Sequence, residues 1–300
     1  MKSRSIGEKI FNIFNISFLI LFCISTLYPF LNILAISLND GMDASLGGIT
    51  IFPRKFTLFN YMLVFQSDDI LKALFFSVLM TVTRTVFALL VTSAAAYVLT
   101  KKDLIFKKGL TTFFLIPMFI SGGLVPYYIV IKSFGLMNNF MVYIFPFLFD
   151  FFFALIIRVY FQSNINESIY ESAYLDGAND IYIFFKIVLP LSKPVLAAVA
   201  LFIGVNAWND WYTTMLFCTD SKGLWTLQFL LQKLVMQVDA ATQLAKRVLH
   251  RSGSVSGDTM ITPQTITYAT LMVATIPIML VYPFLQKYFV SGIMIGSVKG

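Results

Sequence analysis

Charged residues are scarce in this chain. Only 12% of its 300 residues are Asp, Glu, Lys or Arg, whereas 58% are hydrophobic and 32 are Phe. A soluble globular domain has about 25% charged residues, so this composition excludes that class. The apolar runs are long and lack the period-two alternation of transmembrane β-strands. The sequence therefore predicts an all-α protein that crosses a membrane several times.

Cysteine, histidine and nucleotide-binding motifs are also scarce or missing. Cys23 and Cys218 both lie in or at the end of apolar runs, so we expect no disulfide framework. The single His250 has no Cys or His companion, so no metal site is expected. No Gly-rich loop followed by Lys-Ser or Lys-Thr occurs, so we expect neither ATP hydrolysis nor a bound cofactor on this chain. The basic residues behind the net charge of +7 cluster beside apolar runs, which argues against nucleic-acid binding.

Six apolar runs are long enough to cross a bilayer, since about 20 helical residues span ~30 Å of hydrocarbon. They predict one transmembrane domain over residues 10–300, preceded by a short basic segment, residues 1–9. The expected spans are approximately residues 10–36, 73–100, 110–131, 139–161, 195–212 and 268–290.

The distribution of basic residues predicts the orientation, because short cytoplasmic loops carry more Lys and Arg than external ones. Three basic residues precede the first span and four lysines follow the second, whereas the loop between the third and fourth spans has only Lys132. We therefore expect both termini and the loop 163–194 to be cytoplasmic, and the long loop 209–267 to be external.

The segment 163–194 is polar although its neighbours are apolar. Gly177 can end a helix in the left-handed conformation, and Asn179 or Asp180 can cap a second helix after it. An amphipathic helix–Gly–helix element beside membrane spans is most simply a docking surface for a soluble partner. The alternative is an interfacial helix without any partner.

This segment resembles the EAA loop of importer-type ABC permeases, in which Glu-Ala-Ala is followed by Gly and, nine residues later, by a hydrophobic Leu-Pro end. Ser172 stands where that motif usually has Ala. In the family the loop is a coupling helix that inserts into a groove of the cytoplasmic ATPase subunit. The resemblance implies this coupling role for Glu171, Ser172, Ala173, Asp176, Gly177, Ile187, Leu189 and Pro190.

The resemblance covers about residues 10–300. The stretches SGGLVPYYIVIKSFGLMNN, ALFIGVNAWNDWY and ATIPIMLVYPFLQKYFVSGIMIGSVKG are similar to carbohydrate-uptake permeases of the maltose-permease type, closest to the lipoprotein-associated polysaccharide or oligosaccharide group. The resemblance implies a multi-pass subunit of a bacterial cell membrane. Its implied partners are a homologous second permease, two cytoplasmic ATPases that hold ATP and Mg, an extracellular solute-binding protein and a carbohydrate. It also implies that the C-terminal tail contacts the ATPases through Gly296, Ser297, Val298, Lys299 and Gly300.

Polar residues inside spans cost about 2.5–3.5 kcal/mol each on insertion scales, which makes them candidates for function. In a continuous fourth helix one face would carry residues that recur every three or four positions: Asn139, Tyr143, Pro146, Asp150, Ala154 and Arg158. Arg84 is the clear charge of the second span. The sequence permits Asp150 either to pair with Arg84 or to face water in a substrate cavity. We favour the cavity.

Asn206, Trp208 and Asn209 cluster at the outer end of the fifth span. Sugar-binding sites combine amides, which bond hydroxyls, with flat aromatic rings, but an interfacial aromatic belt would give the same pattern. The predicted function is the transmembrane subunit of an ATP-driven oligosaccharide importer. The alternative is a stand-alone secondary transporter or channel, which needs intramembrane ion sites and usually an internal repeat.

Overall fold

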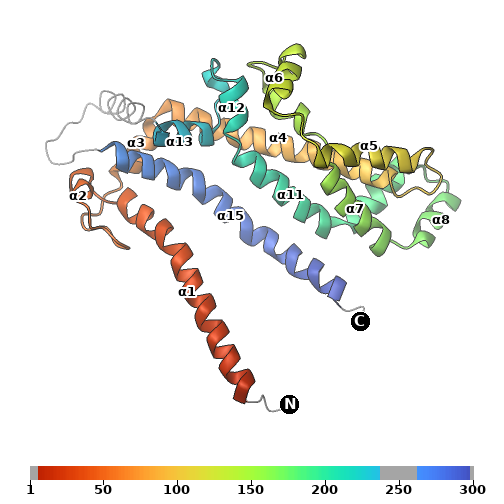
Figure 1. The fold of residues 1–300 in the computed structure, drawn as a ribbon, viewed down its shortest axis with the longest axis horizontal. Coiled ribbons are helices and arrows are strands. Elements are labelled where there is room, and N and C mark those ends of the chain that lie inside the picture. The colour runs from red at the N-terminus through yellow and green to blue at the C-terminus, as the bar shows by residue number, and fades with distance from the viewer. Residues whose placement is uncertain (1–5, 237–261, 298–300) are drawn as a thin grey trace. The chain divides into compact units, whose positions relative to one another are not determined.

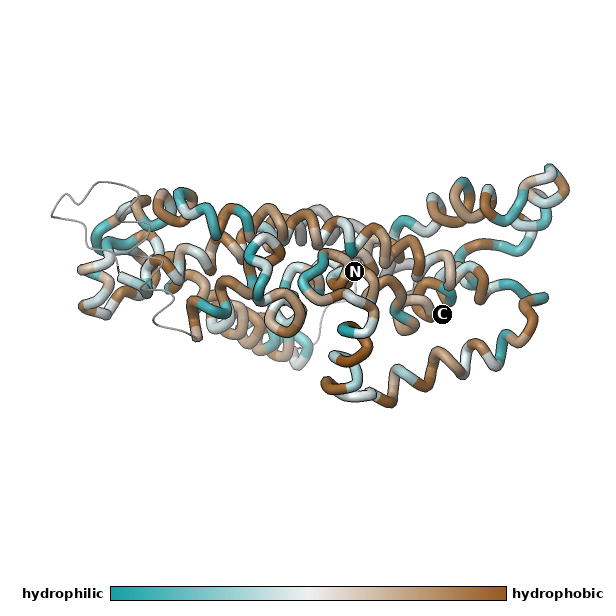
Figure 2. The backbone as a smooth tube through the Cα atoms, turned by 90° about the horizontal axis from the view of Figure 1, so that it is seen from above, coloured by the Kyte–Doolittle hydropathy of each residue, from teal (hydrophilic) through white to brown (hydrophobic). Residues whose placement is uncertain are grey.

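The structure is a computed structural model that describes residues 6–236 and 262–297. Over this part of the chain it is helical, with a single isolated bridge between Asn39 and Phe56 and no strands (Figure 1). The predicted all-α class is confirmed. Hydrophobic residues predominate along the long helices (Figure 2).

The chain forms two compact units. Unit 1 contains residues 1–71 and 231–275, and unit 2 contains residues 72–230 and 276–300.

In unit 1, helix α1 (Ile6–Ser37) exposes apolar side chains on all sides, which is typical of a helix that lies in lipid. The short helices α2 (Gly41–Ser45) and α3 (Phe59–Gln66) follow it. The buried amide of Asn60 donates to the carbonyl oxygens of Ser37 and Asn39, both at 2.9 Å, and thereby fixes α3 to the end of α1.

Unit 2 is organised around α4 (Asp68–Val98), whose first turn belongs to unit 1. Two buried clusters lie along this helix. One joins its C-terminal half to α7, α8 and α11, and the other joins its N-terminal half to η1 and α12. The remaining elements are α5 (Lys107–Phe119), α6 (Leu124–Ser133), η1 (Phe140–Tyr143), η2 (Phe145–Phe147), α7 (Phe151–Asn164), α8 (Glu167–Leu175), α9 (Asp180–Ile183), η3 (Phe184–Val188), α10 (Leu189–Leu191), α11 (Lys193–Trp208), α12 (Tyr212–Phe217) and η4 (Lys222–Leu224). Two further helices, α13 (Leu227–Met236) and α15 (Pro263–Ser297), have residues in both units.

Within the described residues, three helices are individually long and apolar enough to cross a membrane: α1, α4 and the 263–280 part of α15. Three bent pairs raise the number to as many as six, if each pair is one span. These pairs are α5 with α6, bent by 118°, η1–η2 with α7, bent by 50°, and the 180–191 segment with α11, bent by 84°.

The continuous fourth helix that the predicted polar face requires is broken in the structure, and the third span is broken as well. Between α5 and α6 the backbone leaves the helix and reaches Gly123 at φ +83°, a conformation that favours glycine. The fourth span begins as two short 3-10 helices, η1 and η2, with Pro146 inside the second, and then breaks before α7, where Asp150 is extended with φ −127° and ψ 116°. Proline lacks the N–H that a continuous helix requires. These breaks change which side chains can share a face.

Candidate coupling loop and substrate hollow

The break between α8 and α9 has the geometry that the sequence predicts for Gly177. Helix α8 ends at Leu175, and Gly177 follows at φ +79°. The N–H of Ala178 donates to the carbonyl of Ala173 at 2.9 Å, and the N–H of Gly177 donates to that of Tyr174 at 3.0 Å. This pair of bonds is a Schellman motif, which requires a left-handed residue at its centre.

Helix α9 begins with a cap from Asn179 and not from Asp180. The Asn179 side chain accepts the N–H of Tyr182 at 2.8 Å. After α9 the chain widens into a π-helical turn, η3, and α10 then begins at Leu189 with Pro190 in its first turn. Ile187 and Leu189 are half-buried against the first cluster. These two motif residues therefore fix the loop to the bundle.

The remaining motif residues divide by exposure. Ala173 is buried, whereas Glu171, Ser172, Asp176 and Gly177 are exposed. Sequence reasoning missed three large apolar side chains on the same element, whose exposed fractions are high: Leu175 (89%), Ile181 (70%) and Tyr182 (55%). The sequence does carry a signal for these three side chains, because they are apolar residues that flank a polar motif on an amphipathic helix.

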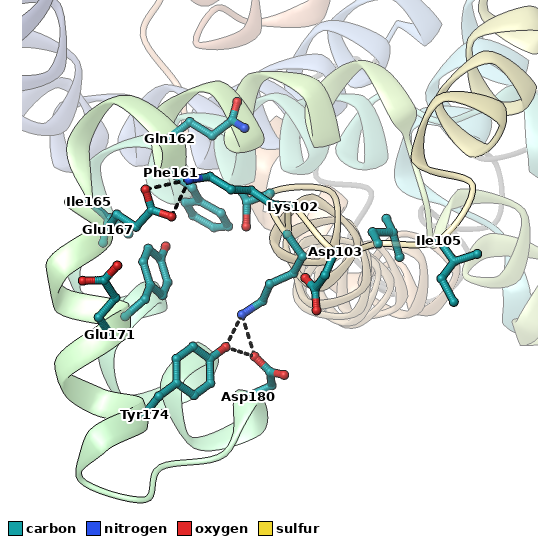
Figure 3. Close-up of a pocket in the computed structure, with 14 residues that line it drawn as sticks. Lys102, Asp103, Ile105, Phe161, Gln162, Ile165, Glu167, Glu171, Tyr174 and Asp180 are labelled. Carbon is teal, nitrogen blue, oxygen red and sulfur yellow. Dashed lines mark hydrogen bonds and ion pairs between the residues drawn. The ribbon is translucent and has the colours of Figure 1, made fainter.

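Lys101, just beyond the end of α4, contacts the candidate coupling loop, residues 163–194, through an ion pair with Asp180 and a hydrogen bond to Tyr174, and it also bonds Tyr97 of α4. Figure 3 shows Tyr174 and Asp180 facing each other. The Lys101 Nζ donates to Asp180 Oδ1 at 2.6 Å and to the Tyr97 hydroxyl at 2.7 Å, and it also donates to the Tyr174 hydroxyl. Both tyrosines donate to the same Asp180 oxygen, at 2.9 Å and 2.6 Å. We refer to Lys101, Asp180, Tyr97 and Tyr174 as the lysine clasp.

The lysine clasp stays charged over a wide pH range. Hydrogen bonds from Lys101 and Tyr174 lower the pKa of Asp180 to about 2, although burial opposes this. Burial alone would lower the pKa of Lys101, but bonds to Asp180 and the tyrosines raise it overall. The lowered pKa of the carboxyl contributes stability above pH ~4, and the raised pKa of the amine contributes below pH ~10. In the folded protein the pair remains ionised beyond both limits, since the pKa of Asp180 is about 2 and that of Lys101 is raised.

A second lysine makes a parallel contact. Lys102 Nζ lies 2.6 and 2.8 Å from the two carboxylate oxygens of Glu167, at the start of α8 (Figure 3). A hollow of about 800 Å³ separates the α4–α5 loop from α8 and α9, and both lysines and both acidic partners line it.

Arg84, near the middle of α4, pairs with Asp210 in the structure. Its Nη1 lies 2.8 Å from Asp210 Oδ2, and the two side chains are only 8% and 10% exposed. The guanidinium also lies over the Phe147 ring, 3.3 Å from its centroid. Asp210 accepts two further bonds, from the N–H and the hydroxyl of Thr213 at 3.0 and 2.8 Å. Among the described residues the buried Nε of Arg84 has no hydrogen-bond partner.

A hollow of about 490 Å³ opens beside this pair. The predicted residues Asn206 and Asn209 line it and are exposed. A smaller hollow of about 150 Å³ is lined by Arg84, Asn206 and Asp150, among others. The residues of the larger hollow are Arg84, Tyr127, Phe147, Asn206, Asn209, Asp210, Trp211, Tyr212, Thr213 and Phe217.

The polar face predicted along the fourth span does not exist as a single face. Asp150 is exposed and caps α7, accepting the N–H groups of Phe152 and Phe153 at 2.8 and 3.3 Å. It does not pair with Arg84, whose partner is Asp210. The stripe assumed a continuous helix, and the bend at residues 148–150, between η2 and α7, removes that continuity.

Three other predicted path residues lie outside both hollows. Tyr143 is fully buried, and its hydroxyl bonds Thr214 and the Leu224 carbonyl, so it is part of the core. Asn139 caps η1 by accepting the Met141 N–H at 2.9 Å. Trp208 is buried at the end of α11. The structure thus brings together Arg84, Asn206, Asn209 and, in the smaller hollow, Asp150.

Two further predictions concern the tail and metal binding. Gly296 and Ser297 are the last residues of α15, whereas Val298, Lys299 and Gly300 lie outside the described residues. Over the described part of the chain, no group of three His, Cys, Asp or Glu is placed to hold a metal ion.

Comparison with known proteins assigns this arrangement to a family. Residues 74–295 match the binding-protein-dependent transport system inner membrane components. The chain belongs to this family of ABC importer permeases. It is therefore a multi-pass membrane subunit of a bacterial ABC importer and not a stand-alone secondary transporter. A separate subunit hydrolyses the ATP.

Relatives match over nearly the full length of the permease. A polygalacturonan/rhamnogalacturonan permease of Bacillus subtilis, YtcP, is 38% identical over 98% of this chain and 99% of its own length. LplC of the same organism is 37% identical, over 97% of this chain and 96% of its own length. A solved bacterial ABC transporter that imports the acidic polysaccharide alginate superposes with a TM-score of 0.85 at 25% identity, covering 96% of this chain and 100% of that one.

Proposed function

We propose that this permease imports an oligosaccharide, and that the hollow beside Arg84 contacts the sugar. The hollow combines the amides of Asn206 and Asn209 with the aromatic rings of Tyr127 and Trp211. Amides can bond hydroxyls, and flat rings can stack on the apolar face of a sugar ring. The carbohydrate substrates named for the relatives support this substrate class.

The complete importer contains this chain, a homologous second permease, two cytoplasmic ATPases and an extracellular solute-binding protein. The exposed side chains of Leu175, Ile181 and Tyr182, beside the turn at Gly177, support the docking of an ATPase on the coupling loop. Closure of the ATPases around ATP and Mg then pulls this loop and rocks the bundle. We assign the C-terminal tail, 296–300, to a second contact with the ATPases.

Co-expression with the partner subunits tests this function. In proteoliposomes with the binding protein present, we expect ATP-dependent uptake of labelled oligosaccharides and co-purification of the ATPases. Uptake that persists without ATP or without the ATPases contradicts the proposal.

The proposed orientation predicts the accessibility of introduced thiols. In a Cys23→Ser background, Asn166→Cys should react with a membrane-impermeant maleimide only after permeabilisation, whereas Ser45→Cys should react in sealed cells. Both positions are exposed in the structure, so burial does not limit their reaction. The remaining native Cys218 is buried. Labelling of residue 166 in sealed cells contradicts a cytoplasmic coupling loop.

The hollow predicts a selective effect of its amides. Asn206→Ala should raise the half-saturating sugar concentration about two- to tenfold, because one net hydrogen bond is worth about 0.5–1.5 kcal/mol. Asn139→Ser is the matched control, since Asn139 lies outside the hollow and serine also caps helices. Uptake kinetics in proteoliposomes measure both variants. An effect of Asn139→Ser without one of Asn206→Ala places the sugar elsewhere.

A further inference from the structure

Two consecutive lysines connect α4 to both helices of the coupling loop. Lys102 pairs with Glu167, the first residue of α8, and Lys101 pairs with Asp180, the first residue of α9. Both closest contacts are 2.6 Å. The loop that follows α4 therefore contacts the coupling element on either side of its glycine turn.

The two ion pairs differ in the burial of the lysine and not of the carboxylate, since Asp180 and Glu167 are 61% and 62% exposed. The side chains of Lys102 and Glu167 are 81% and 62% exposed, and pairs of this kind contribute little. Lys101 is only 23% exposed. Its ammonium lies 4.3, 5.1 and 5.7 Å from the ring centroids of Tyr97, Tyr174 and Tyr170, within range of cation–π attraction. Lys101 is thus held by several interactions at once, whereas Lys102 has one.

The lysine clasp is attached to a rigid part of the bundle. Tyr97 belongs to the last turn of α4, is buried, and packs on Phe184 of the π-helical turn with centroids 5.5 Å apart. Tyr174 comes from α8 and Asp180 from α9. Movement of either coupling helix must therefore move the end of α4 or break these bonds.

Helix α4 leads from the lysine clasp to the hollow. From Arg84 to Val98 it runs without a break for 14 residues, which is ~21 Å at 1.5 Å per residue. Arg84 lies between the residues that α4 gives to the two buried clusters, Phe76 and Met80 on one side and Ala88 and Ala96 on the other. A displacement at the helix end is therefore carried to the pair that lines the hollow.

We propose that Lys101 is a positioning residue that transmits movement of the coupling loop to α4, and that Lys102 is not. The proposal rests on the assignment of residues 163–194 as the ATPase-coupling loop. Lys101, which would transmit the movement, lies outside the sequence motif and on a different loop. The lysine clasp links ATP hydrolysis to the hollow, whereas the motif itself supplies the contact with the ATPase.

Lys101→Met tests this role because it keeps most of the aliphatic side chain and removes the ammonium. The complete importer, with both permeases, the ATPases and the binding protein, is reconstituted in proteoliposomes. Sugar imported and ATP hydrolysed are measured in the same samples, together with ATPase co-purification and melting temperature. We expect normal co-purification and at least a fivefold fall in sugar imported per ATP. Lys102→Met is the matched control and should retain the wild-type ratio.

Other outcomes separate the alternatives. A wild-type ratio in Lys101→Met with normal assembly overturns the proposal. If Lys101→Met fails to assemble, Asp180→Asn, which keeps the shape of the carboxylate, is measured instead, and a wild-type ratio there also overturns it. An equal fall in Lys101→Met and Lys102→Met indicates a general effect of loop charge and contradicts the assignment to Lys101. A wild-type importer that binds no ATPase or imports no sugar contradicts the proposed function, a result distinguishable from failure of the lysine clasp alone.

Discussion

Gly177→Val is expected to abolish ATP-driven import while the permease still inserts and assembles with its partner. Gly177 has φ +79°, which β-branched residues rarely adopt, and such strain costs about 1–3 kcal/mol. No atom lies within 4 Å of the position that a Cβ would occupy, so the cost arises from the backbone and not from a clash. Relief of the strain requires a different turn, which displaces Leu175 and Ile181. Uptake rate at matched protein yield measures the effect.

Gly177→Asn provides the control, because asparagine visits the left-handed region more readily than other residues with side chains. It should retain most of the uptake. Wild-type uptake by Gly177→Val would show that this turn is not required for coupling.

The second large effect concerns the buried ion pair. Asp210→Ala should lower the stability of the permease by about 3–5 kcal/mol, because it leaves Arg84 charged, buried and unpaired. It also removes the acceptor of the Thr213 N–H and hydroxyl. We expect a strong loss of assembled protein, measured by yield in detergent and by thermal unfolding.

A double variant separates the pair from general damage. Arg84→Met combined with Asp210→Leu removes both charges and should recover much of the lost stability, since apolar replacement of a buried pair is often neutral. Asp150→Asn should have little effect, because Asp150 is exposed and asparagine also caps helices. Equal damage from Asp150→Asn and Asp210→Ala would contradict the pairing of Arg84 with Asp210.

Local features of the fold could be predicted from sequence because their signals lie within a few residues. The apolar runs gave the helical class, and Gly177 gave the left-handed end of α8, since few other residues fit that conformation. Asn179 was one of two predicted caps for α9, and the structure selects it. The cluster of amides at the end of the fifth span identified Asn206 and Asn209 as candidates, and both line the larger hollow.

Long-range pairing could not be predicted in this way. Arg84 and Asp210 are 126 residues apart, and Lys101 and Asp180 are 79 apart. The face assigned to Asp150 depended on an unbroken helix. Periodicity alone does not show where a helix breaks, and residues on either side of a break no longer share a face. A different rule would have selected Asp210: a buried arginine needs an acid, and Asp210 lies within the amide-rich cluster at the end of α11.

The Arg84–Asp210 pair leaves the larger hollow electrically balanced, because the other lining residues are uncharged at neutral pH. Such a wall neither attracts nor repels a uronic acid by net charge, so it is equally open to acidic and neutral sugars. If the hollow contacts the sugar, discrimination by charge is the task of the binding protein and the second permease.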